Sequence, residues 1–238
     1  RFSAEYSGKP LDYYRNLRVT NPSNYLYFYD FGDYQIIGAS PESLVSVKQG
    51  QVTTNPIAGT RPRGKDERED KALAEELLSD EKEVAEHRML VDLGRNDIGK
   101  IARNNSVEVT KYMEVEYFRY VMHLTSVVRG QLLPQLTAMD ALKSTLPAGT
   151  VSGAPKIRAM KRIYELEQEK RGVYAGAIGY LSATGDMDVA IAIRTMILKN
   201  GRAYVQAGAG IVYDSIPANE YQETINKAKS MTKIGEMQ

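Results

Sequence analysis

The chain has 238 residues, of which 42% are hydrophobic and 26% are charged, and its formal net charge is +1. These values are ordinary for a soluble globular protein, and a near-neutral charge without a long basic run argues against nucleic acid as a partner. No apolar run reaches the roughly 18 residues of a membrane span and no signal peptide is visible, so we expect a cytoplasmic protein that does not contact a membrane. The sequence contains no cysteine, which excludes disulfides, thiolate metal sites and a cysteine nucleophile.

Helix and strand patterns come in blocks along the first two thirds of the chain. A short helix is expected at 11–18, followed from 25 to 57 by an antiparallel meander of strands with turn residues between them. After a loop at 58–64, a charged helical region from about 66 to 102 carries an apolar stripe and is interrupted near Ser79. We expect strands at about 107–115 and 121–128, and helices at 138–145 and 154–168.

Three long strand patterns follow at 173–183, 187–198 and 203–213, joined by the hairpin signals 184–186 and 200–201, before a last helix that begins near Ala218. Because strands and helices cluster without a regular strand-helix alternation, we predict an α+β fold of mostly antiparallel β-sheets flanked by helices. No linker or repeat is visible, so we predict one domain over residues 1–238. The chain begins with Arg1, and we expect it to be an N-terminally truncated part of a longer protein.

Two pairs of glutamates are spaced three residues apart within predicted helices, namely Glu83 with Glu86 and Glu220 with Glu223. Side chains at this spacing share a helix face, with Cβ atoms about 5–6 Å apart. If the two helices face each other, four carboxylates converge, which requires a cation between them or protonated carboxyls. Magnesium suits such a site because it takes oxygen ligands and leaves coordination positions for an anionic substrate. The alternative is that both pairs are solvated faces of amphipathic helices.

Three other side chains stand in unusual places. Arg194 lies in the middle of an apolar strand pattern, where an unpaired guanidinium is costly unless it meets an anion. His123 lies in another strand pattern, where a lone histidine is most often a hydrogen-bonded core residue. Glu42 follows Pro41 at a strand end, where the simplest interpretation is a turn residue.

Eight motifs cover most of the chain in a fixed order: SPESL at 40–44, PIAGTRPRG at 56–64, EHRMLVDLGRND at 86–97, VMHL at 121–124, LPAGTVSGAPKIRAM at 146–160, RGVYAGAIGY at 171–180, AIAIRTM at 190–196 and AGAGIVYDSIPANEYQETINKA at 207–228. Together they resemble the chorismate-utilising enzymes, and among these the large synthase subunits of anthranilate synthases. The resemblance implies the fold of that family, chorismate as the substrate and Mg²⁺ as the cofactor. It also implies a lyase reaction of tryptophan biosynthesis that gives anthranilate and pyruvate.

The resemblance implies three catalytic residues. Glu42 corresponds to the general acid that protonates the departing C4 hydroxyl, which requires a raised pKa. His123 corresponds to the histidine beside the substrate ring, where it can assist loss of the C2 proton or elimination of pyruvate. Thr150 is expected against the ring, whereas His87 is expected only to support the site.

The resemblance also implies the ligands of the metal and of the substrate. Glu86 and Glu223 are expected to bind magnesium directly, with Glu83 and Glu220 completing the shell or holding its waters. The residues expected to contact the substrate are Gly59, Thr60, Tyr174, Arg194, Gly208, Ala209, Gly210 and Lys227. Glycines at such positions let the backbone approach a ligand closely, although a β-bulge or a tight strand crossing would use them equally well.

Two local features separate the sister activities of the family. Aminodeoxychorismate synthases commonly have a nucleophilic lysine where this chain has Ala58, and PGGS where it has PAGT at 147–150. Isochorismate and salicylate synthases use a lysine on a strand that would precede Arg1, so this alternative stays open. A third alternative, of another class, is an inactive, metal-stabilised interaction domain.

The source of ammonia follows from composition. A chain without cysteine cannot release ammonia from glutamine through a thiolate, so ammonia comes from solution or from a separate glutaminase subunit. The resemblance favours the glutaminase partner. It also implies an N-terminal part that binds tryptophan for feedback inhibition, which is absent from this sequence.

Overall fold

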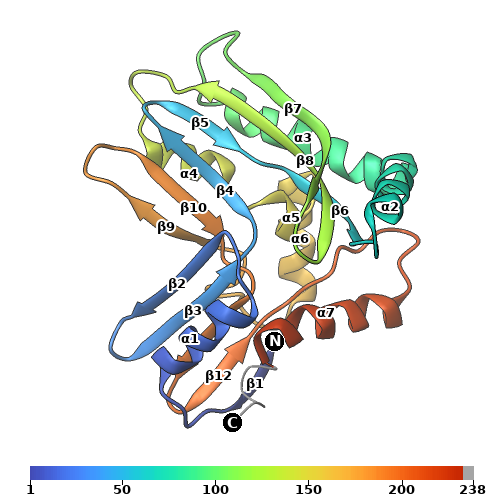
Figure 1. The fold of residues 1–238 in the computed structure, drawn as a ribbon. Helices are drawn as coiled ribbons and strands as arrows, with labels where there is room; N and C mark the ends of the chain where they lie inside the picture. Colours follow the sequence, from blue (N-terminus) through green and yellow to red (C-terminus); the bar gives the residue numbers. More distant parts are fainter. Residues whose placement is uncertain (233–238) are drawn as a thin grey trace.

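The computed structural model describes residues 1–232, which form antiparallel sheets with helices packed against them (Figure 1). The elements, in chain order, are β1 (Phe2–Glu5), α1 (Pro10–Thr20), β2 (Tyr25–Asp30), β3 (Tyr34–Ser40), β4 (Ser43–Lys48), β5 (Gln51–Thr54), β6 (Ile57–Pro62), α2 (Glu67–Ser79), α3 (Glu81–Gly99), β7 (Glu108–Tyr117), β8 (Val121–Gln131), α4 (Ala138–Thr145), α5 (Gly149–Ser152), α6 (Lys156–Leu166), β9 (Ala177–Leu181), β10 (Met187–Ile191), β11 (Thr195–Lys199), β12 (Arg202–Val205) and α7 (Pro217–Thr232).

The strands form two sheets. One has five strands in the order β1-β12-β11-β3-β2, and the other has seven, in the order β6-β8-β5-β4-β10-β9 with β7 paired to β8. Every strand pair is antiparallel. The predicted α+β class with mostly antiparallel sheet is therefore confirmed. Among residues 1–232, no helix combines the length and the apolar character needed to cross a membrane.

The chain passes from one sheet to the other at two places that lie side by side. The first crossing joins β3 to β4, and the second joins β10 to β11. Hydrogen bonds hold them together: Ala39 N donates to Arg194 O over 3.0 Å, Ile191 N donates to Glu42 O over 3.0 Å, and Ser40 Oγ donates to Ile191 O over 2.7 Å. Glu42 and Arg194 are thereby fixed at the junction of the two sheets.

The predicted strand at 187–198 is wrong as a single strand, because β10 and β11 belong to different sheets. The break occurs at Arg194, whose φ of 49° is a left-handed conformation that a continuous β-strand does not adopt. The predicted meander at 25–57 is split in the same way between β3 and β4. Apolar periodicity could not reveal either break, because residues on both sides of each crossing are buried.

Other element boundaries also differ from the prediction. The expected loop at 58–64 is mostly strand β6, which pairs with β8 through a bulge between Ala58 and Thr60. The expected strands at 173–183 and 203–213 shorten to β9 and β12, since both patterns contain glycines that lie outside the ladders. Strand β1 and helix α5 were not expected, and α6 begins at Lys156, just after Pro155.

Buried apolar clusters attach the helices to the sheets. On the seven-stranded sheet the largest cluster includes Val45, Val52, Val128 and Ile191 together with Val91 and Ile98 of α3. On the five-stranded sheet, Ile37 and Met196 pack with Leu17 of α1 and Met231 of α7. Helix α3 is anchored along the seven-stranded sheet and α7 on the five-stranded sheet. The two helices that carry the glutamate pairs therefore have fixed places in the fold (Figure 1).

Candidate active site

Glu42 lies at the first crossing, between β3 and β4, and is partly buried. Burial raises the pKa of its carboxyl to about 7, while a hydrogen bond from Thr150 and the charge of Lys227 act in the opposite direction. A carboxyl with a pKa near 7 can donate a proton at neutral pH. It lines a small cavity of about 50 Å³ that Thr150 and Asp97 also line. Glu42 and Thr150 therefore share one cavity, a contact that the sequence motifs do not specify.

Arg194 lies at the second crossing, in the left-handed conformation that ends β10 and precedes β11. Its side chain is partly buried, and burial lowers the pKa of the guanidinium. Among residues 1–232, no carboxylate forms an ion pair with it and no side-chain hydrogen bond to it is found. A desolvated cation without a protein anion is costly to maintain. An anionic ligand would offset this cost, so substrate binding by Arg194 stays a prediction.

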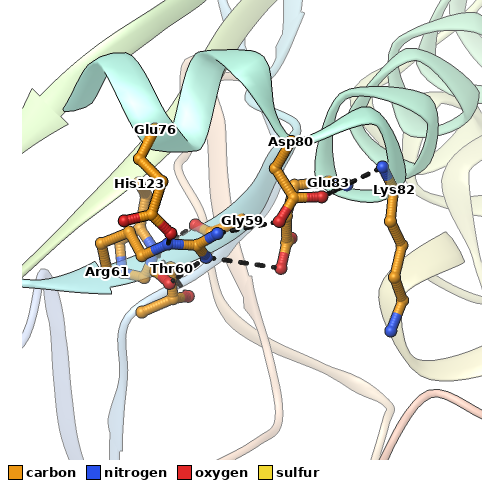
Figure 2. Close-up of polar contacts among 8 residues, drawn as sticks. All are labelled: Gly59, Thr60, Arg61, Glu76, Asp80, Lys82, Glu83 and His123. Carbon is orange, nitrogen blue, oxygen red and sulfur yellow. Dashed lines mark hydrogen bonds and ion pairs between the residues drawn. The ribbon is translucent and has the colours of Figure 1, made fainter. Parts of the chain in front are cut away.

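His123 lies on β8 next to the bulge of β6. Its Nδ1 is 3.0 Å from the carbonyl oxygen of Gly59 and 3.1 Å from Thr60 Oγ1 (Figure 2). Because a carbonyl can only accept a hydrogen bond, we assign the proton to Nδ1, which leaves the lone pair of Nε2 free to take a proton. Burial lowers the pKa of His123, and the charge of Arg194 lowers it further, so the neutral base is favoured. The influence of Arg194 also links this residue to the second crossing.

Tyr174 and Gly208 approach each other closely near the second crossing. Ala192 N donates to Gly176 O over 2.8 Å, and this bond ties the segment that carries Tyr174 to the chain just before Arg194. A Cβ atom at Gly208 would lie 2.7 Å from Tyr174 Oη, so a larger residue would require the tyrosine side chain to move.

Residues 208–210 follow β12 without forming the predicted strand. Lys227 Nζ, from α7, donates to Gly208 O over 3.1 Å and fixes the start of this segment. Ala209 is partly buried and Gly210 is exposed. The backbone of this segment is therefore accessible to a ligand at its far end.

The two glutamate pairs lie on different helices, and each already has a cation from the chain. Glu83 on α3 is 3.7 Å from Arg61, and Glu223 on α7 is 2.5 Å from Lys227. In residues 1–232, no group of three or more histidine, aspartate or glutamate side chains is arranged to hold a metal ion. The structure thus describes Glu83 with Glu86, and Glu220 with Glu223, as separate pairs. Magnesium binding stays a prediction.

The carboxylates of the two glutamate pairs are nevertheless of the chemical type that binds magnesium. Burial raises the pKa of Glu83, and the carboxylate of Glu86 raises it further, a repulsion that a cation would relieve. Carboxylate oxygens are the protein ligands that magnesium prefers, and it uses few of them. A bound cation would have to replace Arg61 beside Glu83 and Lys227 beside Glu223.

Arg61 organises a network that the sequence did not predict. Its guanidinium, on β6, contacts Glu76 Oε1 at 3.1 Å and Asp80 Oδ2 at 2.8 Å in addition to Glu83 (Figure 2). Asp80 also caps α3, since its side chain accepts hydrogen bonds from the backbone N–H groups of Lys82 and Glu83. The network therefore joins β6 to the start of the helix that presents Glu83 and Glu86.

Two more polar features lie near the site without having been singled out from sequence. Asp97 of α3 and Lys156 of α6 form a buried ion pair of 2.6 Å beside the cavity. His87, which was expected only to support the site, is fully buried, and its Nε2 lies 2.6 Å from Ser126 Oγ. The motifs containing Asp97 and Lys156 were noted, but residues 59 positions apart carry no local signal that they pair.

Comparison with known proteins agrees with this geometry. The family model for chorismate binding enzymes matches residues 1–233. Anthranilate synthase component 1 of Lactococcus lactis is 63% identical over 99% of this chain and 52% of its own length, and that of Aquifex aeolicus is 55% identical over 100% and 48%. The chain therefore spans about half the length of these curated relatives.

Solved structures give the same assignment. The crystal structure of anthranilate synthase component I from Streptococcus pneumoniae matches with a TM-score of 0.91 and 84% identity, covering 97% of this chain and 51% of that one. The menaquinone-specific isochorismate synthase of Escherichia coli matches with a TM-score of 0.86 and 26% identity, covering 97% and 53%. The chain belongs to the family of chorismate binding enzymes.

The raised pKa of Glu42 predicts a pH-dependent effect on stability. Its folded value of about 7 exceeds the ordinary 4.5, so the stabilising contribution is fully present below pH 4.5 and is lost as the pH rises through 7. We expect Glu42→Gln to raise the free energy of unfolding at pH 8 by on the order of 2–3 kcal/mol, and by much less at pH 4.5. Urea denaturation at both pH values, with Glu5→Gln as the exposed control, measures this. An equal effect of Glu42→Gln at both pH values would show that the carboxyl is not desolvated.

Proposed function

We propose that the protein to which this chain belongs is the large subunit of an anthranilate synthase. It acts in the cytoplasm, in tryptophan biosynthesis, and converts chorismate and ammonia into anthranilate, pyruvate and water. The observation that carries the proposal is the partly buried Arg194, without a protein carboxylate among the described residues, beside a histidine whose neutral form is favoured. A proton donor with a pKa of about 7 at the neighbouring crossing supports it, as do the names of the relatives.

Binding of chorismate follows from the charges of the site. The substrate carries a carboxylate on its ring and another on its enolpyruvyl ether. We assign the enolpyruvyl carboxylate to Arg194, whose planar guanidinium can donate two parallel hydrogen bonds. Tyr174 Oη and the backbone of residues 208–210 lie on the same side of the site through the contact between Tyr174 and Gly208. The Gly59 and Thr60 bulge is assigned to the ring carboxylate.

The chain supplies an acid and a base for the proton transfers of the reaction. The nitrogen of ammonia bonds to C2, the C4–oxygen bond breaks, and Glu42 gives its proton to the departing hydroxyl, which leaves as water. His123 Nε2 next takes the proton from C2, the bond between C3 and the ether oxygen breaks, and the enolate of pyruvate leaves as the ring becomes aromatic. The proton held by His123 then converts the enolate to pyruvate, and the added nitrogen releases the proton that restores the Glu42 carboxyl. We assign to Thr150, on the same cavity wall, the role of orienting the Glu42 carboxyl during the first step.

Magnesium, when bound, would neutralise the ring carboxylate and the glutamates around it. Glu86 and Glu223 would be its direct ligands, with Glu83 and Glu220 completing the shell. The helices α3 and α7 would bring these carboxylates to the substrate. The ion pairs of Arg61 with Asp80 and Glu83 hold the start of α3 in place.

Ammonia is assigned to a separate glutaminase subunit. Release of ammonia from glutamine in such systems uses a thiolate, and the 238 residues include no cysteine. The methyl group of Ala58, on β6, cannot attack C2 in the way that a lysine could, which favours anthranilate over aminodeoxychorismate as the product.

Product analysis tests the proposal. A chain extended to the length of the relatives should make anthranilate from chorismate, magnesium and ammonium salts. The rate should rise with pH as ammonium gives way to ammonia, and the rise should level off as Glu42, with a pKa of about 7, loses the proton that it donates. Glutamine should replace ammonium only when a glutaminase subunit is added. Anthranilate is identified by its fluorescence and mass. Isochorismate or salicylate as the main product, formed from water, would contradict the proposal, and so would glutamine use by the purified subunit alone.

Arg194→Leu in the extended chain should mainly weaken binding of chorismate. A charged bidentate contact contributes on the order of 1.5–3 kcal/mol, so we expect the KM for chorismate to rise by about 10- to 150-fold. Because the variant removes a buried unpaired cation, its thermal stability should not fall. Arg202→Leu, at an exposed arginine of β12, is the control. An unchanged KM would remove Arg194 from the substrate site.

Calorimetric titration tests the metal site. Magnesium and chorismate should each strengthen the binding of the other, and Glu86→Ala or Glu223→Ala should weaken magnesium binding in the presence of chorismate. Glu81→Ala, at an exposed residue of the same helix as Glu86, should not. If both site variants bind magnesium as tightly as the parent chain, these carboxylates are not its ligands.

A further inference from the structure

A buried ion pair lies beside the cavity that Glu42 and Thr150 line. Asp97, on α3, is 4% exposed, and its carboxylate is 2.6 Å from the ammonium of Lys156, whose side chain is 13% exposed. Lys100, which follows the last residue of α3, contacts the other oxygen of Asp97 at 3.2 Å, but its side chain is 55% exposed. A buried pair of this kind is not required for stability, because apolar residues of similar volume often stabilise a core equally well. Stability alone therefore does not explain why an ion pair occupies this place, and we ask which part of the site the pair holds.

The pair joins the two ends of one segment of chain. Lys156 is the first residue of α6, and its Nζ also donates to the carbonyl of Thr145, the last residue of α4, over 2.8 Å. Ser144 Oγ donates to the carbonyl oxygen of Asp97 over 2.5 Å. Both ends of the segment 145–156 are thus bound to each other and to the same turn of α3.

The middle of this segment carries Thr150. Its helix, α5, packs directly on α3, since a Cβ atom at Gly149 would lie 2.4 Å from Leu93 Cδ2. Thr150 in turn lies on the same cavity wall as Glu42, and its hydroxyl lowers the pKa of the Glu42 carboxyl. Asp97, Thr150 and Glu42 line the same cavity of about 50 Å³.

We propose that the ion pair between Asp97 and Lys156 positions Thr150 against Glu42 by holding both ends of the segment that carries Thr150. Asp97 and Lys156 are positioning residues, since they act on the acid through Thr150. Their importance for catalysis rests on the proposed function, whereas the positioning itself does not.

The pKa of the Glu42 carboxyl reports the contact directly. The groups that act on it are Thr150, whose hydrogen bond lowers the pKa, and Lys227, whose charge also lowers it. Loss of the Thr150 contact should therefore raise the pKa. The chain is labelled with ¹³C in the glutamate carboxyls, the Glu42 signal is assigned from its loss in Glu42→Gln, and the signal is titrated in each variant.

Asp97→Asn and Lys156→Met should both raise the Glu42 pKa, by the same amount as Thr150→Val, and neither should raise it further when combined with Thr150→Val. A direct charge effect predicts opposite directions, because one variant removes a negative charge and the other a positive one. Lys100→Met, which also removes a lysine paired with Asp97, should leave the pKa unchanged.

An unchanged Glu42 pKa in folded Asp97→Asn or Lys156→Met, or opposite shifts in the two, would overturn the proposal even if both variants melt at lower temperature. If neither variant folds, Lys156→Arg and Ser144→Ala decide the question: the first should keep the wild-type pKa and the second should raise it. The titration uses no substrate, so its result is independent of whether the extended chain makes anthranilate.

Discussion

The paired crossing between the two sheets is the constraint on which the site depends. The chain leaves the five-stranded sheet after β3 and leaves the seven-stranded sheet after β10, and three hydrogen bonds hold these exits side by side. Backbone groups at a crossing cannot join either ladder, so they satisfy one another instead. The side chains there are consequently held by the backbone of both sheets. Glu42 and Arg194 owe their proximity to this arrangement.

Arg194 and Glu42 both have an environment or a backbone conformation that costs free energy in the folded protein. Arg194 combines a left-handed backbone with a desolvated guanidinium, and Glu42 carries a carboxyl that burial makes reluctant to ionise. Strained backbones and displaced pKa values are concentrated at functional sites because the surrounding structure overdetermines them. Here the overdetermining elements are the two ladders and the segment 145–156. A ligand that carries negative charge would relieve the cost at Arg194.

The sequence predicted the fold class and most helices, because α2, α3, α4 and α7 have clear apolar periodicity or caps and the strand runs are rich in β-branched residues. Long apolar runs could not show that β10 and β11 lie in different sheets, since burial looks the same on both sides of Arg194. The site residues were named through motifs, and their local spacing alone would have left Glu42 as a turn residue. The motifs did not specify that Glu42 and Thr150 line one cavity, and among residues 1–232 no group of three or more histidine, aspartate or glutamate side chains is arranged to hold a metal ion.

Sequence patterns could not predict the ion pairs between residues that are far apart in the chain. Arg61 with Asp80, and Asp97 with Lys156, are each composed of residues whose own neighbourhoods look like ordinary charged loops or helices. Only the packing of α3 against β6, α4 and α5 brings them together. The site was thus predictable as a set of residues but not as a network.

The crystal structure of the chain with bound chorismate tests the central claim most directly. If Arg194 is the anion receptor at the crossing, one carboxylate of chorismate will lie within about 3 Å of its guanidinium nitrogens. The substrate ring will then lie between His123 and Glu42. Chorismate bound elsewhere, or bound here with both carboxylates away from Arg194, would contradict the account.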